Sequence, residues 1–136
     1  MTSTSLTPAP AKGWNIGLWV AQILLFLVYG LAGFMKTTQP IPDLAAMMVW
    51  PGIVPEVMVR FIGLAELAGA LGLILPMLTK IQPRLTILAA LGLTVLQVFA
   101  IIWHISFAEF AALPVNAVLI GLSVFVLWGR RSKLPL

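Results

Sequence analysis

The sequence contains no cysteine and very few charged residues. The absence of cysteine excludes disulfide bonds, catalytic thiols and thiolate metal ligands. One histidine and four acidic residues are too few for us to expect a metal site built from protein side chains. Charged residues make up 9% of the 136 residues, whereas a soluble domain carries about 25%. With so few charges the chain cannot cover a water-facing surface, so it is not a soluble domain.

Apolar residues make up 61% of the chain and gather in four long runs. These runs predict membrane-spanning helices at residues 14–35, 57–78, 85–107 and 113–129. The first run contains no charged residue and, as a helix, is about 33 Å long, enough to cross the hydrocarbon core of a bilayer. A signal peptide is the alternative for this run, but the run is longer than usual and lacks a convincing cleavage site. The predicted fold is an all-α integral membrane four-helix bundle.

The segments outside these runs are expected to be short or irregular. We expect residues 1–13 to form a disordered cytoplasmic tail and residues 130–136 a basic cytoplasmic tail. Residues 36–56 contain four prolines. Within them Asp43 is expected to cap a short helix through Leu44–Trp50, which Pro51 and Gly52 end. This helix is mostly apolar and too short to span, so we expect an interfacial helix or one folded back into the bundle.

Lysine and arginine residues are distributed unevenly between the ends of the runs. If the N-terminus is cytoplasmic, six lie on the inner side, namely Lys12, Lys80, Arg84, Arg130, Arg131 and Lys133. Only Lys36 and Arg60 then lie on the outer side. This asymmetry predicts a multi-pass protein of the cell (inner) membrane with both termini in the cytoplasm. The basic residues form no stripe, so membrane lipids are expected partners and nucleic acid is not. The tryptophans are interpreted as interface anchors, with Trp14, Trp19 and Trp128 inside and Trp50 and Trp103 outside.

Each predicted span carries at least one polar side chain. Because a polar group that faces lipid is costly, these side chains are expected to face the bundle interior. Gln22, Tyr29 and Lys36 follow one another at seven-residue spacing, which places them on one helical face. Glu56 and Arg60, four residues apart, are expected to form a local ion pair. The remaining pattern predicts a polar pocket in the outer half of the bundle, with the candidate residues Tyr29, Lys36, Arg60, Glu66, Gln97, His104 and Asn116.

Glu66 is the most informative of these residues, because it lies about 13 Å below the outer end of its span, near mid-membrane. A carboxylate at that depth must be ion-paired, hydrogen-bonded or protonated. Gly63, Gly69 and Ala70 share its helical face and allow another helix to approach closely. The sequence leaves open whether Glu66 lines a ligand or proton site or only fixes helix register. It also leaves the partner of Glu66 open among Lys36, Arg60, Gln97 and His104.

Several motifs mark the ends of the spans. The first span ends with Gly30-Leu-Ala-Gly-Phe-Met-Lys36. The second begins with Arg60-Phe-Ile-Gly-Leu-Ala-Glu66 and continues into the glycine-rich run Gly63–Pro76. The last begins with Leu113-Pro-Val-Asn116 and is followed by Trp128-Gly129-Arg130. With these motifs the chain from Trp14 onward resembles the DoxX-like family of small four-helix membrane proteins. The resemblance implies a four-helix bundle in which Lys36, Arg60, Glu66 and Asn116 are family-type positions without a catalytic role.

The resemblance implies only a general function. The family takes its name from a subunit of a membrane thiosulfate:quinone oxidoreductase, and other members resemble accessory parts of membrane redox or detoxification complexes. Relatives in the wider group include thiol-redox membrane proteins, but that activity is not transferable to a chain without cysteine.

Three functions fit these observations. The leading hypothesis is a non-catalytic membrane subunit or accessory protein of a redox system, whose polar outer-half pocket receives a quinone-like or other amphiphilic ligand. One alternative is a binding or transport module for a small lipophilic molecule or proton-coupled solute, and another is a purely structural assembly factor. The chain is not expected to be an enzyme on its own, and no cofactor is evident beyond a quinone or a lipid. We also expect a homo-oligomer or a partner membrane subunit, because small-residue motifs such as Ala68-xxx-Gly72 suit contact with a neighbouring helix.

Overall fold

The computed structural model describes residues 12–133, and all its regular elements over this range are helices. The four long ones are α1 (Lys12–Thr38), α3 (Glu56–Thr79), α4 (Leu85–Ser106) and α5 (Leu113–Trp128). Each belongs to a segment long and apolar enough to cross a membrane, which confirms the predicted fold class. The helix ends agree with the predicted spans to within three residues. Of the predicted tails, residues 1–11 and 134–136 lie outside the described residues.

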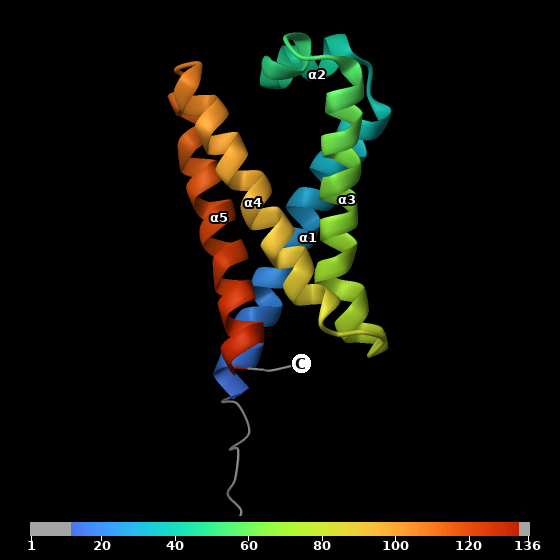
Figure 1. Cartoon of the computed structure of the whole chain (residues 1–136), viewed down its shortest axis with the longest axis vertical. Helices are drawn as coiled ribbons and strands as arrows, with labels where there is room; N and C mark the ends of the chain where they lie inside the picture. Colours follow the sequence, from blue (N-terminus) through green and yellow to red (C-terminus); the bar gives the residue numbers. More distant parts are fainter. Residues whose placement is uncertain (1–11, 134–136) are drawn as a thin grey trace, which may run out of the picture.

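The four long helices form a ring in which each contacts two others. α1 packs against α3 and α5, and α4 packs against the same two helices. Figure 1 shows that α1 begins where α5 ends, and that the pairs α1/α3 and α4/α5 diverge toward the opposite end, where α2 lies. We call these two ends of the bundle the termini end and the α2 end. The chain therefore crosses the bundle an even number of times, and α1 and α5 run in opposite directions.

The interior and the exterior of the bundle are both largely apolar. Leu25, Leu73, Leu93 and Val126, one from each long helix, are buried in a shared core. Large apolar side chains also cover the outside, where Val57 is 80% exposed. Lipid chains solvate such side chains about as well as a protein core does, so the hydrophobic effect does little to hold the helices together. Close packing and polar contacts inside the bundle must therefore hold the helices in register.

The short helix α2 (Ile41–Met48) and the 3-10 turn η1 (Trp50–Gly52) follow α1. The prediction that Asp43 caps this helix is wrong, because the helix begins two residues earlier and no side chain caps it. Pro42 stands in its first turn instead, where a missing N–H costs nothing and the fixed φ suits a helix. Leu44 is fully buried, so α2 is attached to the bundle by its apolar side.

The end of α5 differs from the expected tail. The chain continues as a π-helical turn, η3 (Gly129–Lys133), in which Arg130 is fully buried although we expected it in a basic tail. A side chain at Gly129 would overlap that of Leu18 in α1, so the glycine lets α5 approach α1 closely at this point. This close approach carries Arg130 into the bundle, where Asn15 and Gln22 of α1 accept its hydrogen bonds.

Candidate functional site

Polar side chains run along the inner faces of α1 and α5 at seven-residue spacing. Seven residues are about two helical turns, so each series stays on one side of its helix. Because the two helices are antiparallel neighbours, the two series face each other inside the bundle. We call them together the polar column. Its α1 series is Asn15, Gln22, Tyr29 and Lys36, and its α5 series is Asn116 and Ser123, continued by Arg130 in η3.

An ion pair lies near the α2 end of this column. The ammonium of Lys36 donates a hydrogen bond to Oε1 of Glu66 at 2.7 Å, and both side chains are almost completely enclosed. The structure thereby selects Lys36 from the partners that the sequence left open. The ammonium also lies 5.5 Å from the centre of the Trp50 ring. Trp50, expected only as an interface anchor, thus covers the ion pair through a cation–π contact.

A neutral hydrogen bond joins the other two helices at this end. Nδ2 of Asn116 in α5 donates to Oε1 of Gln97 in α4 at 2.8 Å. Both residues are buried. The contact links α4 to α5 as the contact between Lys36 and Glu66 links α1 to α3. All four long helices are therefore fastened in pairs by buried polar groups.

Tyr29 lies between the two pairs. Its side chain is 1% exposed, and its hydroxyl is close enough to interact with Glu66, Gln97 and Ser123. The hydroxyl nevertheless forms no hydrogen bond of ordinary geometry with any described residue. Ser123, which sequence reasoning did not select, instead donates to the carbonyl of Leu119 in its own helix. Tyr29 therefore holds an O–H group close to Gln97 and Ser123 that has no well-formed hydrogen bond to either.

Three buried polar atoms in the α2 half of the bundle lack a hydrogen-bond partner among the described residues. They are the Tyr29 hydroxyl, Oδ1 of Asn116 and Nε1 of Trp103. Trp103 belongs to α4 and stacks on Phe107, with the ring centres 4.3 Å apart. Each buried polar group without a partner costs about 1–3 kcal/mol. This half of the bundle therefore has two donors and one acceptor without a partner among the described residues.

Arg60 lies beside the column and braces α1. Its Nη2 is 3.1 Å from Oε2 of Glu56, which confirms the predicted local ion pair. Its Nη1 donates to the carbonyls of Lys36 and Gln39, at 2.9 and 2.7 Å. The last carbonyls of a helix have no partner within it, so Arg60 satisfies those at the end of α1. Arg60 therefore positions the helical turn that carries Lys36.

His104 pairs locally with Glu109, which is not one of the candidate residues. Its Nδ1 lies 2.8 Å from Oε1 of Glu109, in the turn after α4. The structure thus brings five of the seven candidate residues together, three from the polar column and one each from α3 and α4 beside it. Arg60 is adjacent through the backbone and His104 is paired locally. The five are Tyr29, Lys36, Glu66, Gln97 and Asn116.

A second polar cluster, centred on Arg130, occupies the termini end of the column. Nε of Arg130 donates to Oε1 of Gln22 at 2.6 Å, and Nη1 donates to Oδ1 of Asn15 at 3.1 Å. Gln22 in turn links the cluster to α3, because its Nε2 donates a hydrogen bond to the carbonyl oxygen of Leu73. Sequence reasoning took Arg130 for a tail residue and overlooked Asn15. Both continue the seven-residue series of their helices, and that spacing is the signal that identifies them.

The crossing of α1 and α3 depends on two glycines. A methyl group at Gly33 would lie 2.7 Å from the carbonyl oxygen of Gly63, and one at Gly63 would lie 2.8 Å from Cβ of Lys36. Only residues without a side chain allow the two backbones to come so near. This close approach is what lets the long side chain of Lys36 reach Glu66 one turn away.

Comparison with known proteins identifies one family. The sequence model of the DoxX-like family matches residues 20–126, which include all of α3 and α4, most of α1 and α5, and all seven candidate residues. No curated protein matches the chain, and no solved structure does.

Proposed function

Because the chain belongs to the DoxX-like family and is a multi-pass membrane protein, we propose that it is a non-catalytic subunit or accessory protein of a membrane redox system. In this proposal the α2 half of the polar column binds the polar head of a quinone-like amphiphile. The chain has no cysteine, so it cannot exchange electrons through a thiol. The electrons for such a ligand would come from a partner membrane subunit, beside which this chain, alone or as a homo-oligomer, holds the ligand.

The unpartnered polar atoms are the observation that carries this proposal. A quinone presents two carbonyl oxygens, which accept hydrogen bonds from donors such as the hydroxyl of Tyr29 and Nε1 of Trp103. Its reduced form presents hydroxyls, which Oδ1 of Asn116 can accept from. Its apolar tail suits a site enclosed by spanning helices. One ligand therefore supplies a partner for both kinds of free atom.

The proposal also includes the orientation of the protein in the bilayer and the membrane in which it lies. We infer that the termini end faces the cytoplasm and that the protein lies in the inner membrane, because lysine and arginine are concentrated at that end. The ligand site then lies in the outer half of the bilayer. A quinone bound there would be reached by a partner on the outer side.

A short-tail ubiquinone analogue tests the proposal. The protein in lipid nanodiscs should bind the analogue with quenching of tryptophan fluorescence, and Tyr29→Phe should weaken binding about fivefold because one hydrogen bond is lost. Thr94→Val is the matched control, since the Thr94 hydroxyl is bonded within its own helix. Equal binding by Tyr29→Phe and the unaltered protein, or no binding by either, contradicts the proposal.

A purely structural role is the second candidate, and one observation favours it. Four polar side chains at the α2 end bond to one another in pairs, Lys36 with Glu66 and Gln97 with Asn116. Such pairs fix helix register without any ligand. Glu66→Gln separates the two roles, because glutamine removes the charge but keeps an oxygen for Lys36.

A further inference from the structure

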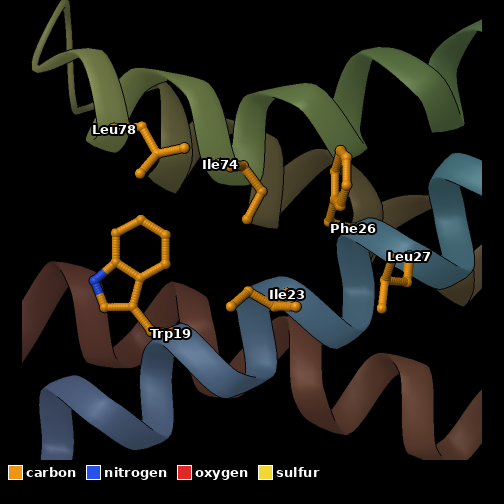
Figure 2. Close-up of a pocket in the computed structure, with 6 residues that line it drawn as sticks. All are labelled: Trp19, Ile23, Phe26, Leu27, Ile74 and Leu78. Carbon is orange, nitrogen blue, oxygen red and sulfur yellow. The ribbon is translucent and has the colours of Figure 1, made fainter.

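A groove runs along the outside of α1 and α3 in the termini half of the bundle. Its volume is about 370 Å³. Figure 2 shows Trp19 and Leu78 facing each other at one end, with Phe26 and Leu27 at the other. From Trp19 to Leu27 the groove covers about 12 Å of helix, close to the depth of one leaflet, which is about 15 Å of hydrocarbon. The lining is entirely hydrophobic: Trp19, Ile23, Phe26, Leu27, Ile74 and Leu78.

Two basic residues lie near the lining residues at the termini end of the groove. On the α1 side, the guanidinium of Arg130 lies 5.5 Å from the centre of the Trp19 ring. On the α3 side, Lys80 follows two residues after Leu78 and is exposed. Lys80 and Gln82 both have positive φ, 59° and 50°. Two non-glycine residues in this region within one turn are energetically costly, and such conformations cluster at ligand-binding positions.

Arg130 has no anionic partner among the described residues. It is fully buried, its contacts are the neutral oxygens of Gln22 and Asn15, and its Nη2 has no hydrogen-bond partner there. All four acidic side chains of the chain lie in the middle or at the α2 end: Asp43, Glu56, Glu66 and Glu109. A buried guanidinium without an anion is costly, and its N–H groups match the oxygens of a phosphate.

We propose that this groove and Arg130 form a binding site for an anionic phospholipid. One acyl chain lies in the groove, the phosphate accepts a hydrogen bond from Nη2 of Arg130, and Lys80 attracts the negative charge from the opposite side. Because Arg130 is enclosed in the protein alone, binding requires the η3 turn to move outward. The site lies at the end opposite the proposed quinone site and does not depend on it.

Native mass spectrometry of the full chain tests this site. With phosphatidylglycerol and phosphatidylcholine of identical chains present together, the protein should retain the anionic lipid at least tenfold more. Lys80→Gln should lower this retention about fivefold, the effect of one basic residue near a lipid surface. Arg130→Gln should lower it tenfold or more, since a charge-assisted hydrogen bond is lost. Arg131→Gln is the matched control, because Arg131 is exposed in the same turn, and it should change retention less than twofold.

Arg130→Gln also removes a bond between η3 and α1, so a second pair of variants keeps Arg130 in place. Ile23→Trp fills the groove and should abolish preferential retention, whereas Val118→Trp, on the exposed face of α5, should leave it unchanged. Equal retention of the two lipids, or full retention by Ile23→Trp, overturns the proposal. Displacement of the lipid by glycerol phosphate alone, or equal retention of oleate, also overturns it, because either result identifies a site for a free phosphate or a carboxylate.

Discussion

Glu66 and Lys36 form an ion pair inside the bundle, where both side chains are almost completely enclosed. Removing one partner of a buried pair leaves the other charge uncompensated, which costs about 3–5 kcal/mol, whereas replacing both by apolar residues is often nearly neutral. We expect Glu66→Leu to lower the free energy of unfolding by at least about 3 kcal/mol. The double substitution Lys36→Met with Glu66→Leu should restore most of it. Denaturant unfolding in detergent measures both.

Glu66→Gln separates a binding role of the charge from a structural one. Glutamine keeps an oxygen for Lys36, so we expect a smaller loss of stability, about 1–2 kcal/mol. If the charge helps to hold the quinone analogue, binding should fall while the protein stays folded. Unchanged binding by this variant would remove the carboxylate from the ligand site and favour the register role.

The residues of the polar column from Gln22 to Lys36 were predictable from spacing, but their contacts were not. Tyr29 and Lys36 stand seven residues apart, and this alone places them on one helical face. The choice of Lys36 over Arg60 as the partner of Glu66 depends on the crossing of α1 and α3, which no local pattern encodes. Arg130 was missed because basic residues after an apolar run ordinarily remain in water, and only the position of α5 against Leu18 carries it inside.

At the level of the helices, the crossing of α1 and α3 gives a further prediction. Gly63→Ala brings a methyl group within 3.0 Å of two Lys36 atoms, so the helices must separate. We expect a loss of about 1–3 kcal/mol of stability, as for other overpacked sites. Gly121→Ala is the control, since nothing lies within 4 Å of its added methyl group, and it should be neutral or stabilising by up to about 1 kcal/mol. Equal thermal stability of the two variants would contradict a close crossing at Gly63.

The small-residue motifs of α3 predicted close helix contacts without saying with which helix. Gly63 contacts α1, whereas Gly72 lies against Ala89 of α4. The motif Ala68-xxx-Gly72, which we considered as a surface for another chain, is thus used at Gly72 within the same chain.

The short helix α2 was predictable in a different respect. Its existence was predictable from its prolines, but its first residue was not, because Pro42 rather than Asp43 determines where it begins.

For the whole molecule, hydropathy was sufficient to predict four helices and their approximate ends, because a bilayer admits few other folds for such a sequence. The order of the helices around the ring was not predictable, since their lipid-facing sides are chemically alike. Val57 and Phe99, on different helices, are both largely exposed, and neither residue type indicates which helix lies beside its own. Only the interior polar groups distinguish one face from another, and they do so through contacts between distant parts of the chain.

The orientation of the molecule in the membrane gives the last prediction. Lys80, Arg84, Arg130 and Arg131 lie at the termini end, against Lys36 and Arg60 toward the α2 end, so the termini end should be cytoplasmic. The chain has no native cysteine, so single cysteines report their side without background. Ile81→Cys, in the exposed turn between α3 and α4, should react with a membrane-impermeant maleimide only after the cells are permeabilised. Met47→Cys in α2 and Phe107→Cys after α4, also exposed, should react in intact cells. The reverse pattern would invert the topology and move the proposed quinone site to the cytoplasmic half of the bilayer.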